Sequence, residues 1–161
     1  MSTLFADLPK ITKGELLLLG SPELRFSQLL TDSRKLISPE ETVFFAMNGK
    51  RLKGIDFIES LYEQGVRNFI VEKKMATDKM EEANILIVKN VVQALQDIVI
   101  HHRKKFHIPI IGITGSNGKT IVKEWLFQLL QGDYDIVRNP KSYNSQIGVP
   151  LSVWKLNTNH Q

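Results

Sequence analysis

An apolar run is followed by Gly112-Ile113-Thr114-Gly115-Ser116-Asn117-Gly118-Lys119-Thr120 and then by an amphipathic segment. A strand, a glycine-rich turn and a helix that opens with Lys-Thr can hold the phosphates of a nucleotide. The backbone N–H groups of such a turn and the N-terminus of the helix attract anions. The ammonium of Lys119 can reach the β- and γ-phosphates, and the hydroxyl of Thr120 can hold Mg²⁺. The sequence therefore predicts a phosphate-binding loop in this stretch.

The residues on either side of the loop agree with a strand–loop–helix unit. Ile108-Pro109-Ile110-Ile111 is predicted to form a buried strand. The segment after the loop carries one apolar stripe at helical spacing, made of Ile121, Val122, Trp125, Leu126, Leu129 and Leu130. One position departs from the general pattern G-x-x-x-x-G-K-[ST], because Ile113 stands where its first glycine is expected. A glycine-rich turn can also be a simple tight turn, but Gly-Lys-Thr in this setting favours phosphate binding.

The loop also resembles that of a known family. Residues 114–120 are similar to the T-G-[ST]-N-G-K-[ST] loop of the Mur ligases and folylpolyglutamate synthetases, which lacks the first glycine. In these enzymes ATP phosphorylates a carboxylate, and an amine then displaces the phosphate to form an amide. The resemblance implies that the chain binds ATP and Mg²⁺, with Lys119 catalytic and Thr120 a metal ligand. The implied ATP-binding residues are Thr114, Gly115, Ser116, Asn117, Gly118, Lys119 and Thr120.

The composition indicates a soluble protein of a reducing compartment. The chain has 161 residues, of which 42% are hydrophobic, and it has no cysteine with which to form a disulfide. Its first residues lack the basic flank and apolar region of a signal peptide, and no apolar run approaches the length of a membrane span. We therefore expect a cytoplasmic protein with no membrane partner.

The net charge is +4, and the densest cationic cluster is His101-His102-Arg103-Lys104-Lys105 at the end of a predicted helix. Cations in a last helical turn complement the helix dipole, and few aromatic residues accompany these, so we expect no nucleic-acid partner. His101 and His102 are adjacent and point to different helix faces, which makes them a poor metal pair. Both are expected to be surface residues.

Residues 1–107 alternate strand-like and helix-like segments, which predicts a small N-terminal α/β domain of about one hundred residues. Strands are predicted at Glu15–Leu19, Phe26–Leu30, Thr42–Ala46, Asn68–Val71 and Asn84–Val88. Helices are predicted at Ile55–Gln64, at Asp78–Glu82 and from Val91 onward. Gly65 suits the C-terminal stop of the first of these helices.

Residues 108–161 are predicted to form the first βαβα part of a P-loop nucleotide-binding domain. A strand at Asp135–Arg138 and a helix at Ser145–Leu156 follow the loop and its helix. A parallel sheet of this type needs several more strands before both of its faces are buried. We therefore expect this chain to be the N-terminal part of a longer protein.

A second resemblance concerns the first domain. Thr31-Asp32-Ser33-Arg34, followed by residues 43–49 and 54–58, is similar to the N-terminal domain of the Mur ligases, where a D-[ST]-R turn precedes an L-F-x-A-x-x-G strand and loop. In that family this domain holds the uridine diphosphate of a UDP-N-acetylmuramoyl peptide. The resemblance implies substrate-binding roles for Asp32, Ser33, Arg34, Asn48 and Gly49. A hydroxyl and a guanidinium fork suit phosphate oxygens, although the same residues also suit a plain turn and a surface charge.

A third resemblance concerns residues 142–151, which read S-Y-N-S-Q-I-G-V-P-L. They are similar to the N-N-x-I-G-V-P-L segment of the family member that adds D-alanyl-D-alanine to UDP-N-acetylmuramoyl-tripeptide in peptidoglycan precursor synthesis. The resemblance implies that Asn144 binds substrate, while its position also suits a helix cap. The segment also resembles the version of that ligase fused to an alanine racemase. Pyridoxal phosphate is therefore expected only if a racemase domain follows.

Three other functions stay open. A sister Mur ligase or a folylpolyglutamate-type ligase would share the loop. A P-loop kinase or ATPase would share Lys119 and Thr120 but would not need the turn at residues 32–34. The isolated chain could also be a non-catalytic nucleotide-binding module. The family's metal-binding Glu and His, its carbamylated Lys and its ATP-clamping domain cannot be placed in this sequence, so we expect the 161-residue chain to have no turnover by itself.

Overall fold

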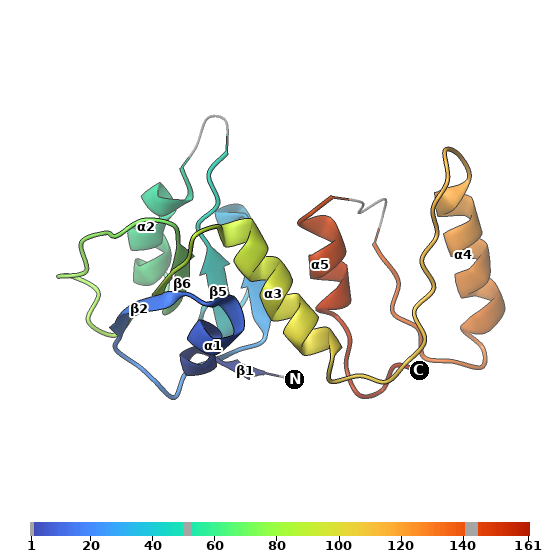
Figure 1. Cartoon of the computed structure of the whole chain (residues 1–161), viewed down its shortest axis with the longest axis horizontal. Coiled ribbons are helices and arrows are strands. Elements are labelled where there is room, and N and C mark those ends of the chain that lie inside the picture. The colour runs from blue at the N-terminus through green and yellow to red at the C-terminus, as the bar shows by residue number, and fades with distance from the viewer. Residues whose placement is uncertain (1, 50–52, 141–144) are drawn as a thin grey trace. The chain divides into compact units, whose positions relative to one another are not determined.

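The structure is a computed structural model that describes residues 2–49, 53–140 and 145–161. The chain divides into two compact units, Met1–Ile98 (unit 1) and Val99–Gln161 (unit 2). Unit 1 combines a mostly parallel sheet with helices, which confirms the predicted α/β fold class (Figure 1). No helix among the described residues has both the length and the apolar character needed to cross a membrane.

Unit 1 is built on a five-stranded sheet with the order β2-β7-β6-β5-β4. Its strands are β2 (Glu15–Leu19), β4 (Gln28–Leu30), β5 (Thr42–Phe45), β6 (Asn68–Val71) and β7 (Asn84–Ile87). The strands β4, β5, β6 and β7 pair in parallel, and β2 is an antiparallel strand beside β7. Two further short strands, β1 (Thr3–Leu4) and β3 (Arg25–Phe26), pair with each other in a separate sheet.

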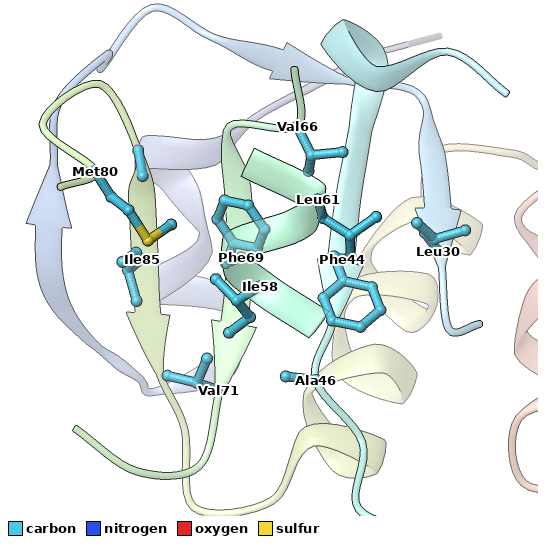
Figure 2. Packing of buried hydrophobic residues seen from close by; sticks show 11 residues of the cluster. Leu30, Phe44, Ala46, Ile58, Leu61, Val66, Phe69, Val71, Met80 and Ile85 are labelled. Atoms are coloured by element: carbon cyan, nitrogen blue, oxygen red, sulfur yellow. The ribbon is translucent and has the colours of Figure 1, made fainter. Parts of the chain in front are cut away.

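Helices cover both faces of the five-stranded sheet. On one face lies α2 (Ile58–Glu63), which continues from a 3₁₀ turn, η4 (Gly54–Phe57). Figure 2 shows Ile58 and Leu61 of α2 against Phe44 of β5 and Phe69 of β6. Behind the sheet in the same view lie α1 (Leu8–Thr12) and the first part of α3 (Val91–Arg103).

Side chains alternate between the two faces of a strand, so the neighbours of the Figure 2 residues point toward α1 and α3. These residues are fully or almost fully buried and comprise Val43, Phe45, Ile70 and Leu86. Every residue of β5 and β6 is buried. Burial on both faces explains why these strands read in the sequence as nearly unbroken apolar runs.

Most of the elements predicted for residues 1–107 are present. The strands Glu15–Leu19 and Asn68–Val71 have the predicted bounds. Gly65, the predicted stop of the helix that becomes α2, has φ 100° and follows Gln64, the C-cap of that helix. The predicted helix at Ile55–Gln64 is formed by η4 and α2 together. The predicted single strand at Phe26–Leu30 is instead split between β3 and β4, which belong to different sheets.

The helix predicted at Asp78–Glu82 is wrong. This segment forms two successive turns, in which Met80 N–H donates to the Thr77 carbonyl at 2.8 Å and Ala83 N–H donates to the Met80 carbonyl at 2.9 Å. Met80 is the one side chain of the predicted helix that enters the core, so an amphipathic helix here would have no apolar face to bury.

Unit 2 contains α4 (Lys119–Leu130) and α5 (Gly148–Val153) after the end of α3. The helix predicted after the glycine-rich loop is therefore present, and the helix predicted at Ser145–Leu156 is shorter than expected. The strands predicted at Ile108–Ile111 and Asp135–Arg138 are wrong, because neither segment forms a β-ladder with another described segment. Ile110 and Ile111 consequently expose 60% and 64% of their surface.

The prediction that His102 lies on the surface is also wrong. Its side chain is buried between the rings of Phe106 and Trp154, whose centroids lie 5.0 Å and 4.4 Å from its own. Its Nε2 lies 3.0 Å from the carbonyl oxygen of Leu156, so this nitrogen carries the proton of the neutral ring. Burial lowers the pKa of His102.

Candidate nucleotide-binding sites

The predicted uridine-nucleotide residues follow neighbouring strands of the parallel sheet. Asp32, Ser33 and Arg34 come after β4, and Asn48 and Gly49 come after β5. Because β4 and β5 run in parallel, both segments lie at the carboxyl edge of the sheet. Ligands of open α/β sheets commonly bind at this edge.

The turn after β4 is held by its own ion pair. Asp32 accepts hydrogen bonds from Arg34 Nε at 2.9 Å, from Arg34 Nη2 at 2.8 Å and from the Arg34 backbone N–H at 3.2 Å. Ser33 and Arg34 open the 3₁₀ turn η2 (Ser33–Lys35), with Asp32 as its N-cap. The hydrogen bonds from the Arg34 side chain lower the pKa of Asp32 to about 2, although burial opposes this shift. Arg34 exposes 86% of its side chain, so this turn presents a guanidinium of fixed position to solvent.

The loop after β5 is held by close backbone packing. Gly54 lies so near the end of β5 that a Cβ atom built on it would stand 2.3 Å from the carbonyl carbon of Ala46. Asn48 pairs with Lys53 in an isolated antiparallel bridge, and both Asn48 and Gly49 are exposed. The Asn48 side chain donates to Glu72, the first residue after β6, at 3.4 Å. Glu72 was not among the residues predicted from the sequence.

The glycine-rich loop has the backbone conformation that its glycines suggest. Gly115 has φ 144° and Gly118 has φ 78°, a region that other residues rarely adopt. Gly118 is the N-cap of α4, which begins at Lys119 as predicted. Thr114, Ser116 and Asn117 are exposed within the loop. The loop is therefore accessible at the N-terminus of a 12-residue helix.

Lys119 folds back over the loop that precedes it. Its Nζ donates to the carbonyl oxygens of Gly115 and Ser116, the latter at 3.4 Å. Thr120 follows it in the first turn of α4. A charged phosphate oxygen is a stronger acceptor for an ammonium than a neutral carbonyl oxygen. The Lys119 ammonium can therefore exchange its carbonyl partners for a phosphate placed at the loop.

A cavity of about 1100 Å³ in unit 2 adjoins the loop. Its walls include Lys119, Thr120 and apolar residues of α4, α5 and the segment at 108–113. The apolar stripe predicted for α4 is poorly covered, since Trp125 and Leu129 expose 64% and 75% of their surface. On the same helix, Glu124 forms an ion pair with Arg138, whose guanidinium lies 3.9 Å from the ring centroid of Phe127.

Asn144, the substrate-binding residue predicted in the third motif, lies outside the described residues, as do Ser142 and Tyr143. Within the described ranges, no three His, Cys, Asp or Glu side chains cluster in a way that would hold a metal ion. The Thr120 hydroxyl is one oxygen ligand of the kind that Mg²⁺ accepts alongside nucleotide phosphates.

Comparison with known proteins assigns the family. Residues 26–116, more than half of the chain, match the family described as the Mur ligase family, catalytic domain. The chain belongs to the Mur ligase family. It is 31% identical over 140 residues to a UDP-N-acetylmuramoyl-tripeptide–D-alanyl-D-alanine ligase from Synechocystis, and 30% identical over 123 residues to the enzyme of that name from Bacillus subtilis. These alignments cover 87% and 76% of this chain, and 30% and 26% of the relatives.

Two solved structures of this ligase are also similar. The crystal structure of MurF from Acinetobacter baumannii matches all of this chain with a TM-score of 0.88 and 27% identity. The MurF ligase from Thermotoga maritima, crystallised in complex with ADP, matches 83% of this chain with a TM-score of 0.71 and 28% identity. The matched regions cover 34% and 30% of those chains, so this chain spans about a third of the length of its relatives.

Proposed function

We propose that this chain is the substrate-loading part of an ATP-dependent ligase that adds D-alanyl-D-alanine to UDP-N-acetylmuramoyl-tripeptide through an acyl phosphate. The observation that carries this proposal is the glycine-rich loop, with Gly118 in a left-handed conformation and Lys119 at the start of α4. The names of the similar ligases from Synechocystis and Bacillus subtilis support this choice of substrates. The reaction serves peptidoglycan precursor synthesis, and we propose a cytoplasmic location for it.

In this proposal residues 1–107 bind the uridine diphosphate end of the muramoyl substrate. Arg34 and the backbone N–H groups around Ser33 would contact the diphosphate, and the Asn48–Gly49 loop would contact the rest of the nucleotide. The support is that both segments leave the carboxyl edge of one parallel sheet. Asp32 would hold the Arg34 guanidinium in place, since it accepts from two of its nitrogens.

Residues 108–161 would bind ATP at the loop that includes Thr114–Asn117 and Gly118. Lys119 would contact the β- and γ-phosphates and offset the charge that accumulates as the tripeptide carboxylate is phosphorylated. Thr120 would hold a Mg²⁺ ion that supplies further charge neutralisation when it is bound. Asn144 would contact substrate near the site of amide formation.

Separate binding measurements on the 161-residue chain test this proposal. The ligase function predicts that both UDP-N-acetylmuramoyl-tripeptide and ATP bind, whereas a kinase or ATPase would bind ATP alone. Arg34→Ala should weaken the muramoyl substrate about tenfold, the size of one charge-assisted hydrogen bond, and leave ATP binding unchanged. Arg25→Ala, on the separate small sheet, is the matched control. If the muramoyl substrate binds no better than uridine, the proposed substrate domain is refuted.

The resemblance around residues 142–151 leads us to propose, further, that the ligase is fused to an alanine racemase. A racemase of this kind holds pyridoxal phosphate as a Schiff base on a lysine. The full-length protein should then show the visible absorbance of a lysine-bound pyridoxal phosphate. A full-length protein without that cofactor, even after incubation with it, would refute the fusion and leave the ligase proposal intact.

A further inference from the structure

Glu72 joins two elements at the carboxyl edge of the sheet. Its Oε1 accepts the backbone N–H of Val91, the first residue of α3, at 3.1 Å. This N–H has no partner within the helix itself, so the carboxylate supplies one. Its Oε2 accepts from Asn48 Nδ2 at 3.4 Å. The hydrogen bond from Val91 therefore holds the Glu72 carboxylate in place, and its second oxygen, Oε2, faces the loop after β5.

The chemistry of this contact fixes the orientation of the Asn48 amide. An ionised carboxylate can only accept hydrogen bonds, whereas an asparagine side chain has both a donor and an acceptor end. The NH₂ end must therefore face Glu72, and Oδ1 must point away from it. Asn48 is exposed, and its backbone is held by the bridge to Lys53. Among the described residues, none donates a hydrogen bond to this Oδ1.

We propose that Glu72 is a specificity-determining positioning residue, which turns the Asn48 amide so that an acceptor oxygen faces the ligand. The site would then select a ligand with an N–H or O–H group at that point. A uridine nucleotide sugar offers such donors in the imide N–H of its base and in its hydroxyl groups. Its phosphate oxygens only accept, so Asn48 Oδ1 would not contact the diphosphate. This inference rests on the proposed function of unit 1.

The test exchanges the hydrogen-bond donor and the hydrogen-bond acceptor between residues 48 and 72. In Glu72→Gln the new side chain can still accept from Val91, but it turns an NH₂ group toward Asn48. The Asn48 amide then has to flip, and it offers the ligand a donor in place of an acceptor. We expect binding of UDP-N-acetylmuramoyl-tripeptide to the 161-residue chain, measured by calorimetry, to weaken about 3- to 10-fold.

The double variant E72Q/N48D distinguishes whether Glu72 orients the Asn48 amide or only stabilises the loop after β5. Its introduced amide donates to the introduced carboxylate, whose other oxygen is again an acceptor for the ligand, and its net charge equals that of the unmodified chain. We expect binding within about threefold of the unmodified chain, although N48D alone places two carboxylates together and binds weakly. Glu59→Gln, which changes an exposed carboxylate on α2, is the matched control.

Three outcomes overturn the inference. Equal weakening in E72Q and in the double variant would mean that Glu72 only braces the loop. Unchanged binding in E72Q would refute the inference and leave the proposed function intact, and no binding to the unmodified chain would refute both. If E72Q unfolds, Asn48→Ala tests the acceptor itself, because it removes Oδ1 without touching α3. It should weaken binding about 3- to 10-fold, and unchanged binding would overturn the inference.

Discussion

Asn84, the first residue of β7, is completely buried, and its side chain connects three segments of unit 1. Its Nδ2 donates to the Ser21 carbonyl at 2.7 Å and to Asn68 Oδ1 at 2.9 Å, and its Oδ1 accepts from Ser21 N–H at 3.0 Å. Asn68 in turn donates to the Thr42 carbonyl at 3.5 Å. This amide chain crosses β7, β6 and β5 where these strands begin. We predict that Asn84→Leu, which keeps the number of side-chain heavy atoms, destabilises unit 1.

The size of this destabilisation follows from the groups that lose Asn84 as their hydrogen-bond partner. Asn68 is also completely buried, so its Oδ1 would lose its partner at a cost of about 1–3 kcal/mol. Ser21 is only half-buried, and water can replace its two hydrogen bonds at a cost of roughly 0.5 kcal/mol each. The free energy of unfolding should therefore fall by about 2–4 kcal/mol, a large part of the 5–15 kcal/mol typical of a domain.

Native-state hydrogen exchange of the β6 and β7 amides measures this change. Fluorescence would not, because both tryptophans, Trp125 and Trp154, lie in unit 2. In the double variant N68L/N84L the free energy of unfolding should fall by less than the sum of the falls in the two single variants, because no buried side-chain amide is left without a partner. If the free energy of unfolding falls by less than about 0.5 kcal/mol in Asn84→Leu, or if the effects of the two substitutions are additive in the double variant, this prediction is wrong.

Three further predictions concern the turn after β4, the loop after β5 and the buried histidine of unit 2. The pKa of Asp32 is lowered from 3.8 to about 2, so its stabilising effect is complete above pH 3.8 and lost as pH falls through about 2. Carboxyl NMR should show this pKa and its return toward 3.8 in Arg34→Ala. Gly54→Ala should cost about 1–3 kcal/mol, measured by exchange of the β5 amides, because its Cβ would collide with Ala46. Since the pKa of His102 is lowered, unit 2 should lose stability as pH falls below 6.5, and tryptophan fluorescence should show this loss to be absent in His102→Gln.

The sequence predicted the sheet of unit 1 well because burial leaves a direct mark on composition. Residues 42–45 and 68–71 are buried on both faces, so they are nearly all apolar. The amide chain through Asn68 and Asn84 was not predicted. Asparagine at the start of a strand usually indicates only a turn, and the bond from Asn84 to Ser21 joins residues 63 positions apart.

Glu72 was not predicted for the same reason, because its contacts join residues that are far apart in the sequence. Its partners, Asn48 and Val91, lie 24 and 19 positions away, so no local pattern marks it. Asp32 and Arg34 were found because their contact spans only two residues and their spacing is part of a motif. The candidate site at the carboxyl edge was thus predictable where its contacts are local, and not where they depend on strand order.

In unit 2 the conformation of the glycine-rich loop was predicted correctly, whereas the strand predicted before it is absent from the described residues. Gly115 and Gly118 adopt positive φ values for steric reasons that need no distant partner, and α4 begins at Lys119 because its first turn closes locally. The segment 108–111 is apolar enough for a buried strand, but a strand forms only when another segment pairs with it. Apolar composition predicts that a segment can be buried and does not specify its partner. Phosphate binding by this chain would therefore depend on the local conformation of the loop, and ATP titration of Lys119→Ala against the unmodified chain measures that contribution directly.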